Sequence, residues 1–274
     1  MSKKLKQQYR GRLAPSPTGY LHLGHAKTFW TAFERCRDAD GTLIYRDEDI
    51  DFHRCKESFS QAAVEDLKEL GINWDEGPIK QSLRTAQYVA VLEKLVSMNL
   101  AYPCNSSRKT IKEHPDTKLS RDGESIFPKS LRPAPFLPIE SVNLNTNWRF
   151  KVPENRMVTF TDGKQGAISY ECHVDFGDFL VWRKDGMPAY ELAVVADDID
   201  MGITEVVRGA DLLVSTARQL LIYEALDAIP PEFYHEDLVT DDSGERLAKR
   251  KDSLAIRTLF AQGYTSESIR GMWA

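Results

Sequence analysis

The first hundred residues alternate between short strand-like runs and longer helix-like stretches, and this alternation constrains the fold more than any other feature. Residues 11–14 are expected to form a short strand that ends at Pro15, and residues 42–45 are a compact candidate for a buried strand. Apolar residues recur at helical spacing in three later stretches, which begin near Gly24, Phe59 and Tyr88. Strand–helix alternation of this kind predicts an α/β fold with a doubly wound parallel sheet.

The character of the chain changes near residue 103. Residues 103–147 are polar and contain several prolines, which indicates an irregular insertion. Short strands are expected after it, over 148–152, 157–161 and 179–183. The α/β pattern then resumes with the apolar run at 192–195, the strand Glu205–Arg208 and a helix that follows Thr216.

These patterns predict a nucleotide-binding fold that is split by an insertion. The segment after residue 250 is too short to form another independent domain. The expected parts are the first half of a Rossmann-like catalytic domain in 1–102, a connective insertion with short strands in 103–186, the second half of the catalytic domain in 187–240, and a basic loop with a short helical C-terminal segment in 241–274.

Composition excludes several classes of protein. Hydrophobic residues make up 42% and charged residues 28%, as in ordinary soluble globular proteins. With no apolar run of membrane-spanning length and a charged N-terminus, the chain is expected in the cytoplasm and away from membranes. Its 4 cysteines are scattered without a CxxC pair, which favours reduced thiols. The net charge of −5 does not exclude a nucleic-acid partner, because phosphate contacts depend on local basic patches.

The most informative segment is APSPTGYLHLGH, residues 14–25. Its prolines stiffen a strand-to-helix turn, and its glycines allow the backbone to approach a ligand closely. His22 and His25 are three residues apart at a helix N-terminus, where the helix dipole favours phosphate. Imidazole donors aimed at an α-phosphate can stabilise the charge of a transition state. A zinc site is the alternative, but the segment offers no third ligand.

Three further segments carry polar residues where a ligand could bind. Acidic residues follow the second strand in 46–51, where a carboxylate can meet an ammonium group or simply face water. Arg208 ends a later strand, and a guanidinium matches a carboxylate bidentately. Residues 243–252 form a basic loop, which suits phosphates or a solvated surface.

Taken in order, the segments resemble the class I aminoacyl-tRNA synthetases. His22-Leu-Gly-His25 resembles the HIGH signature of that class, and the run Arg-x-Ala-Pro-Ser-Pro-Thr-Gly before it resembles the glutamyl branch. Residues 246–250 resemble a degenerate KMSKS loop that lacks the serine at position 248. The resemblance covers most of the chain outside the insertion. It implies a class I Rossmann-like doubly wound parallel sheet, split by an insertion and without an anticodon-binding domain.

The resemblance also implies a site, with no metal among its ligands. The residues implied in catalysis are His22, His25 and Lys249. Those implied in binding glutamate are Arg12, Ala14, Ser16, Glu48, Tyr190 and Arg208. Those implied in binding ATP are Pro15, His22, Gly24, His25 and Lys249. Two positions depart from the family pattern, since Asp47 stands in place of an apolar residue and Glu191 in place of an amide.

The implied reaction is the activation of L-glutamate with ATP and Mg²⁺, without tRNA. Short chains of this build resemble the glutamyl-Q tRNA(Asp) synthetases, which transfer glutamate to queuosine in the anticodon loop. The expected partners are therefore L-glutamate, ATP and queuosine-bearing tRNA(Asp), and the expected state is a monomer. Many short members hold zinc in the insertion, but a lone thiol at Cys104 cannot hold it, so no zinc is expected.

Three alternatives stay open. The chain could be a truncated or split glutamyl-tRNA synthetase that charges a tRNA 3′ end with the help of a further partner. It could be a non-catalytic paralogue that binds glutamate or tRNA, although the two histidines and Lys249 favour catalysis. It could also be a nucleotidyltransferase of related fold, although its substrates would not require Arg12, Glu48 and Arg208 together.

Overall fold

A computed structural model describes residues 8–133, 142–239 and 255–273. The chain divides into two compact units. One comprises Met1–Leu83, Gly202–Leu212 and Pro231–Ala274, and the other comprises Arg84–Met201 and Leu213–Pro230. The boundaries expected from the sequence for the two catalytic halves and the insertion stay a prediction, because compactness alone does not test them.

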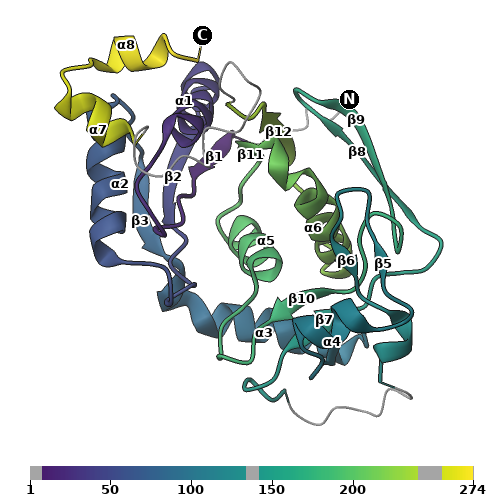
Figure 1. The fold of residues 1–274 in the computed structure, drawn as a ribbon. Coiled ribbons are helices and arrows are strands. Elements are labelled where there is room, and N and C mark those ends of the chain that lie inside the picture. Colours follow the sequence, from purple (N-terminus) through teal and green to yellow (C-terminus); the bar gives the residue numbers. More distant parts are fainter. Residues whose placement is uncertain (1–7, 134–141, 240–254, 274) are drawn as a thin grey trace, which may run out of the picture. The chain divides into compact units, whose positions relative to one another are not determined.

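Strands and helices alternate along most of the first unit, as expected. Figure 1 labels the elements. They are β1 (Arg10–Leu13), α1 (Leu23–Asp38), β2 (Thr42–Asp47), α2 (Glu57–Glu69), β3 (Glu76–Lys80), β11 (Glu205–Gly209), β12 (Glu232–Glu236), α7 (Ile256–Ala261) and α8 (Ser266–Arg270). Within the described residues, β3 and β12 are strands that the sequence patterns did not predict.

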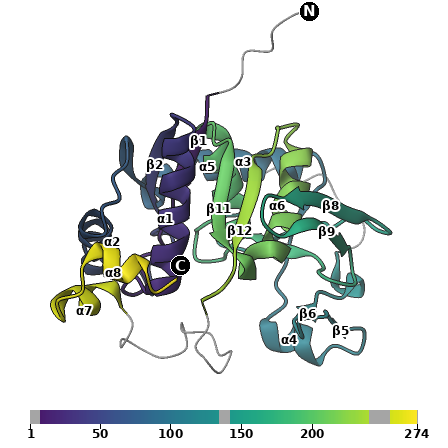
Figure 2. The same cartoon turned by 90° about the horizontal axis from the view of Figure 1, so that it is seen from above.

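The strands of this unit run parallel and reverse their order at β1. Strand β2 pairs with β1 on one side and β3 on the other, and β11 pairs with β12. Strand β11 lies beside β1, because the N–H of Thr204 donates to the carbonyl of Arg10 over 2.9 Å. The order is therefore β3, β2, β1, β11, β12, and Figure 2 shows β2, β1, β11 and β12 from above. In such sheets ligands bind at the carboxyl ends of the strands where the order reverses.

The apolar residues that recur at helical spacing form one buried face of α1 in the first unit. Helix α1 buries Leu23, Ala26, Phe29 and Ala32 at the spacing of one helical face. These side chains join one apolar cluster with the strands, α2 and α7, to which Ile256 contributes. Each large side chain in such a cluster contributes roughly 1.5–3 kcal/mol to the free energy of folding. The cluster holds the start of α1 in a fixed position.

Strand β3 can pair with β2 because position 77 is glycine. Gly77 has a φ of +100°, and a Cβ there would lie 2.3 Å from the carbonyl oxygen of Tyr45. The register between β2 and β3 shifts at this point. The charged and proline-containing sequence of β3 has no strand-like alternation, which is why the sequence did not predict it.

Asp47, the residue that departs from the family pattern, is buried at the end of β2. Its carboxyl group is 1% exposed and accepts a hydrogen bond from the hydroxyl of Ser60 on α2. Its Oδ1 atom has no hydrogen-bond partner within the described residues. Burial raises the pKa of this carboxyl above its ordinary value of 3.8, with the hydrogen bond from Ser60 opposing the shift.

We expect Asp47→Asn to stabilise the protein at pH 7 by about 1 kcal/mol, because a neutral amide avoids burying a charge. A carboxyl group whose pKa is raised in the folded state stabilises the fold below about pH 4, where it is protonated. This stabilisation is lost as pH rises through the pKa of the folded state. The stability difference between Asp47→Asn and wild type should therefore grow from pH 4 to pH 7 in thermal unfolding.

The matched control for this substitution is Glu93→Gln, which removes an exposed carboxylate on α3 (Thr85–Ser97). It should leave the pH dependence of unfolding unchanged. A lower stability of Asp47→Asn than of wild type at pH 7 would contradict the prediction, because it would mean that the charged form is the favoured one.

The second unit combines helices with short antiparallel strands. In addition to α3, its elements are β4 (Ala101–Pro103), α4 (Arg108–Glu113), β5 (Lys118–Leu119), β6 (Ser125–Ile126), β7 (Trp148–Phe150), β8 (Met157–Asp162), β9 (Gly166–Glu171), β10 (Phe179–Trp182), α5 (Tyr190–Asp200) and α6 (Leu213–Ala225). Strands β10, β7 and β4 form one antiparallel sheet, and β8 and β9 form a hairpin. The strands expected near 148, 157 and 179 are present.

The described part of the insertion is held by packing and by one buried carboxylate. Cys104 lies in a small apolar cluster with Tyr102 and Phe127, and its side chain is buried. Asp178, 3% exposed, accepts two hydrogen bonds from Arg132, both of 2.7 Å. The described part of this segment is therefore less irregular than its sequence suggests, because these long-range contacts order it.

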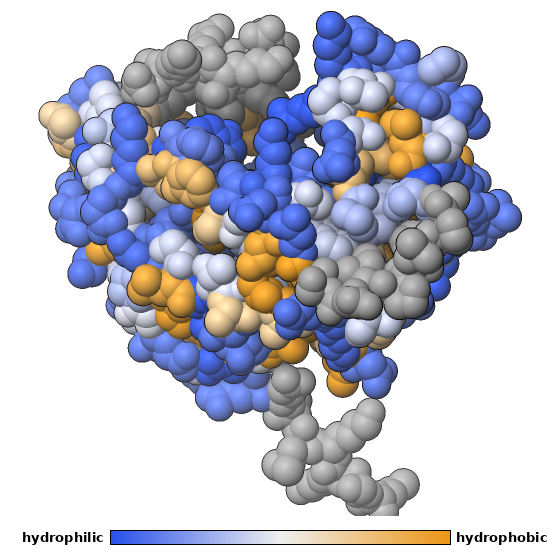
Figure 3. All heavy atoms as spheres, turned by 90° about the horizontal axis from the view of Figure 1, so that it is seen from below, coloured by the Kyte–Doolittle hydropathy of each residue, from blue (hydrophilic) through white to orange (hydrophobic). Residues whose placement is uncertain are grey.

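Apolar side chains are mostly inside, and those at the surface are scattered. On the face drawn in Figure 3, hydrophilic residues predominate and apolar ones occur in small groups. The most exposed large apolar side chains in the described parts include Ile229 and Leu83. Among the helices described, none is both long and apolar enough to cross a membrane.

Candidate active site

Two stacked histidines begin helix α1. The ring centroids of His22 and His25 lie 3.6 Å apart with an interplanar angle of 21°. His22 is the N-cap residue, and its Nδ1 accepts from the backbone N–H groups of Gly24 and His25 over 3.1 and 3.3 Å. A Cβ on Gly24 would lie 3.0 Å from the His22 ring, so glycine makes room for this cap. The two imidazoles, three residues apart in the sequence, therefore lie side by side.

The hydrogen bonds at Nδ1 assign the protons of the two rings. His25 also uses Nδ1 as an acceptor, from the N–H of His22 over 3.4 Å. A neutral imidazole that accepts at Nδ1 carries its proton on Nε2. Loss of hydration lowers the pKa of both rings, while the charge of Asp211 opposes the shift at His22. Both histidines thus offer Nε2–H donors beside a helix N-terminus, which suits phosphate oxygens.

The loop before α1 is tied to the loop after β2. The N–H of Glu48 donates to the carbonyl of Pro15 over 3.0 Å, and the N–H of Lys56 donates to that of Pro17 over the same distance. Pro15 is buried, Ala14 is half-buried and Ser16 is exposed. These backbone hydrogen bonds place the predicted glutamate-binding carboxylate next to the predicted ATP-binding loop.

Glu48 is held by an arginine that sequence reasoning missed. Its Oε1 atom accepts from Nη2 and Nε of Arg46 over 3.0 and 3.2 Å. Arg46 is fully buried and Glu48 is 6% exposed. An arginine directly after the apolar run at 43–45 was the available signal, since such a charge is buried only when it is paired. The ion pair holds the Glu48 carboxylate in one orientation.

Two buried arginines end neighbouring strands at the point where the sheet order reverses. Arg12 on β1 donates from Nη1 to the carbonyl of Val207 on β11 over 2.7 Å. Arg208, the next residue on β11, donates from Nε to Nε2 of His235 on β12 over 3.1 Å. Together with Glu48 after β2, the two guanidinium groups lie at the carboxyl ends of three parallel strands. They offer charge and geometry for an amino-acid ligand.

Two further residues predicted for the site lie outside the described part of the first unit. Tyr190 is the first residue of α5 in the second unit and is half-buried. Its neighbour Glu191 accepts a hydrogen bond of 2.9 Å from Gln219 on α6, which accounts for a carboxylate where an amide was expected. Lys249 lies outside the described residues, and its role stays a prediction.

The donors of this site suit anions better than a bound metal. Imidazole and guanidinium N–H groups pair with phosphate and carboxylate oxygens. Within the described ranges, three or more His, Cys, Asp or Glu side chains never gather as a possible metal site. Mg²⁺ commonly binds through the phosphates of a nucleotide, where it neutralises part of their charge.

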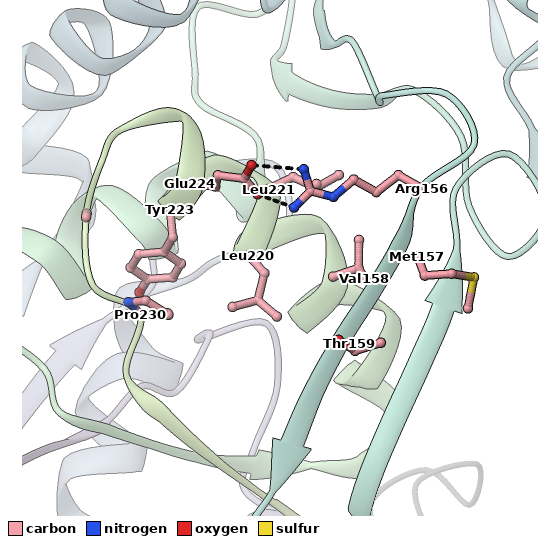
Figure 4. A pocket seen from close by; sticks show the side chains of 10 residues that line it. Arg156, Met157, Val158, Thr159, Leu220, Leu221, Tyr223, Glu224 and Pro230 are labelled. Atoms are coloured by element: carbon pink, nitrogen blue, oxygen red, sulfur yellow. Dashed lines mark hydrogen bonds and ion pairs between the residues drawn. The ribbon is translucent and has the colours of Figure 1, made fainter.

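A separate cavity lies in the second unit, between the β8–β9 hairpin and α6. It has a volume of about 360 Å³, and Leu220, Val158 and Tyr223 line it. An exposed ion pair of Arg156 and Glu224 lies at its edge, as Figure 4 shows. None of the predicted glutamate- or ATP-binding residues lines this cavity.

Comparison with known proteins identifies the family. Residues 8–272 match the family described as tRNA synthetases class I (E and Q), catalytic domain. The chain belongs to this family. The resemblance drawn from the motifs is therefore confirmed, as are the α/β fold class and the assignment as a synthetase-type ligase. Enzymes of this class I family use ATP, generally with Mg²⁺.

Relatives within the class I (E and Q) family differ in length. The chain is 40% identical to a protein of Nitratidesulfovibrio vulgaris named glutamyl-Q tRNA(Asp) synthetase, with 97% of the chain and 85% of that relative covered. It is 36% identical to a glutamate–tRNA ligase of Sulfurihydrogenibium sp., with 95% of the chain and 56% of that ligase covered. The chain spans about half the length of the glutamate–tRNA ligases that it matches.

Solved structures of the family agree with the fold. A glutamate tRNA ligase from Elizabethkingia meningosepticum, solved in complex with its amino acid, matches with a TM-score of 0.75 and 28% identity. The match covers 90% of this chain and 53% of that chain. A second ligase, from Elizabethkingia anophelis, matches with the same TM-score at 29% identity.

Proposed function

We propose that this chain activates L-glutamate with ATP in the absence of tRNA and transfers it to queuosine in the anticodon loop of tRNA(Asp). The observation that carries the proposal is the set of Arg12, Glu48 and Arg208 at three adjacent strand ends, beside the two histidines of α1. An amino acid with a second carboxylate needs one anion to meet its ammonium group and cations to meet its carboxylates, and this set supplies both.

The relatives support the choice of acceptor. Identity to the relative named glutamyl-Q tRNA(Asp) synthetase is 40%, against 36% to the glutamate–tRNA ligase. The chain also covers 85% of the former and 56% of the latter. A split glutamyl-tRNA synthetase that charges a tRNA 3′ end is the second candidate, because relatives with that name also match most of this chain.

The proposed chemistry has two steps. An oxygen of the glutamate α-carboxylate attacks the α-phosphorus of ATP, and the bond to pyrophosphate breaks. Glu48 holds the ammonium group, and the Nε2–H groups of His22 and His25 stabilise charge on the phosphoryl oxygens as it develops. Lys249 is assigned to the phosphates of the leaving pyrophosphate. In the second step a hydroxyl of the tRNA base attacks the acyl carbon, and AMP leaves with the former carboxylate oxygen.

Glutamate-dependent ATP–pyrophosphate exchange without tRNA tests the first step. Wild type should exchange with glutamate and not with glutamine or aspartate. Lys249→Ala should lower the rate by about 100-fold or more, because a phosphate-neutralising charge is lost. The control Lys184→Ala removes an exposed lysine in the turn after β10 and should have no effect.

The acceptor is tested with radiolabelled glutamate and four tRNAs. Label should enter tRNA(Asp) that contains queuosine and stay absent from tRNA(Asp) that lacks it. Label that enters tRNA(Glu) instead, or exchange that starts only when tRNA is added, would favour the split synthetase. Activation without transfer to tRNA(Asp), tRNA(Glu) or tRNA(Gln) would refute the proposed acceptor. No exchange under any condition would favour a non-catalytic paralogue.

A further inference from the structure

A buried histidine on β12 contacts the glutamate-binding arginine of the proposed site. His235 is the register partner of Arg208 across the β11–β12 ladder. The Nε of Arg208 donates to Nε2 of His235 over 3.1 Å, and the two residues are 4% and 0% exposed. The ring of Phe233, on the same face of β12, lies 5.5 Å from the guanidinium carbon. The imidazole and this ring are themselves stacked, with centroids 6.1 Å apart.

The contact defines the protonation of His235. The Nε–H of arginine is always a donor, because the guanidinium group keeps its protons at any ordinary pH. His235 must therefore accept at Nε2 and carry its single proton on Nδ1. A hydrogen bond from a charged group to a neutral acceptor in a buried place is strong, since water does not compete for either atom.

The contact also decides which edge of Arg208 faces a ligand. A guanidinium group can bind a carboxylate in two bidentate ways, through its side edge of Nε and one Nη, or end-on through both Nη atoms. His235 occupies the Nε atom and so takes the side edge. The end-on edge is the one that can bind a carboxylate with two parallel hydrogen bonds.

We propose that His235 is a positioning residue for glutamate selection, which orients Arg208 so that the side-chain carboxylate binds end-on through the two Nη atoms. This inference rests on the proposed function and assigns the side-chain carboxylate of glutamate to Arg208. His235 itself does not touch the substrate. Its effect is to hold a side chain of four rotatable torsions in one orientation, with Phe233 packed against its face.

Removing the acceptor should affect glutamate more than ATP. In His235→Leu the guanidinium group loses its orientation, and we expect the KM for glutamate to rise about 10- to 100-fold. The KM for ATP and the rate at saturating glutamate should change less than about threefold, because the histidines of α1 are unaltered. A general loss of folded protein would lower the rate and leave both KM values unchanged.

Two amide variants separate the hydrogen bond from packing. The oxygen of His235→Gln can reach the place of Nε2 and accept from Arg208, whereas the shorter side chain of His235→Asn cannot. We expect His235→Gln to restore the KM for glutamate to within about threefold of wild type, and His235→Asn to resemble His235→Leu. Thermal unfolding of each variant confirms that it folds. If His235→Leu does not fold, the comparison of His235→Gln with His235→Asn still tests the hydrogen bond.

A double substitution tests whether His235 acts through Arg208. Lysine has no group equivalent to Nε–H at that place, so Arg208→Lys removes the contact from the other side. His235→Asn should then add little to Arg208→Lys, as expected for residues that act as one unit. Fully additive effects would mean that His235 acts on glutamate by another route and would overturn the proposal.

The outcomes also distinguish this proposal from the proposed function. Wild type without glutamate-dependent exchange would refute both. Wild type that is active, with His235→Asn and His235→Gln showing equal KM values for glutamate, would refute the positioning role alone. Equal increases in the KM for glutamate and ATP would refute it too. Support would come from a higher KM for glutamate in His235→Leu and His235→Asn, with the KM for ATP little changed and with His235→Gln close to wild type.

Discussion

Arg208→Gln is expected to raise the KM for glutamate in ATP–pyrophosphate exchange by about 30-fold to several thousand-fold. Removing one partner of a buried, hydrogen-bonded charge pair costs about 2–5 kcal/mol, and each 1.4 kcal/mol corresponds to a factor of ten. Arg208 is 4% exposed, so water can replace little of the lost interaction. The side-chain carboxylate of bound glutamate would then be left without its main partner.

The same variant should change the choice between glutamate and glutamine. A buried guanidinium group rejects glutamine because it would be left without a carboxylate, and Arg208→Gln removes that penalty. The ratio of kcat/KM for glutamate over glutamine should therefore fall by about 10-fold or more. Arg208→Lys should be intermediate, because an ammonium group keeps the charge but not the bidentate geometry.

The control for Arg208 is an arginine in an exposed ion pair. Arg156 pairs with Glu224 in the second unit, and both side chains are about half exposed. Arg156→Gln should leave the KM for glutamate and the glutamate-to-glutamine ratio unchanged, because exposed pairs contribute little. An Arg208→Gln enzyme with a wild-type KM for glutamate would remove Arg208 from the amino-acid site.

His25→Ala is expected to lower the rate of exchange at saturating substrates by about 100- to 1,000-fold, as measured when one donor to a developing charge is removed. The KM for glutamate should change little, because this ring is assigned to the phosphates of ATP and not to glutamate. The Nδ1 of His25 makes only one long hydrogen bond to backbone, of 3.4 Å, so the variant should fold normally.

His22 has two roles that can be separated. Its Nδ1 caps α1, and its Nε2–H is the proposed phosphate donor. His22→Asn keeps an N-cap acceptor and loses the donor, so it should lower the rate without lowering the melting temperature. His22→Ala loses both and should also destabilise the fold by about 1 kcal/mol.

Rate measurements and thermal unfolding on His25→Ala, His22→Asn and His22→Ala test these expectations. His53→Ala, which removes an exposed histidine in the loop after β2, is the control and should match wild type. A His25→Ala enzyme with the wild-type rate would exclude this ring from transition-state stabilisation.

Much of the candidate site could be predicted because its signals are local. Helix α1 is recognisable from its apolar spacing, and its N-terminus from the contiguous motif that ends at His25. Arg12 lies in a short strand that ends just before Pro15, and Glu48 lies just after a strand that the apolar run at 43–45 marks. A parallel sheet brings the carboxyl ends of its strands to one edge, so residues at those ends can be grouped before the strands are seen.

Other elements were not predicted correctly, because their sequences carry no clear local signal. Strand β12 has the sequence Glu-Phe-Tyr-His-Glu, which does not alternate between polar and apolar residues and is too short to distinguish from a loop. Residues 192–195 lie in α5, where residues 191–198 are all buried. A helix that is buried on every side has no polar face and therefore no period that marks it.

Residue types, motif order and the family to which the chain belongs follow from the sequence without a fold. The identity of each side chain's partner does not. Arg208 and His235 are 27 positions apart, and this separation does not by itself indicate a contact. Only the β11–β12 register makes them neighbours. Asp47 likewise reads as one acid among several, until the packing of α2 against β2 buries it. Strand register and helix packing are long-range properties, because they depend on how distant segments fit together rather than on the spacing of residues along one segment.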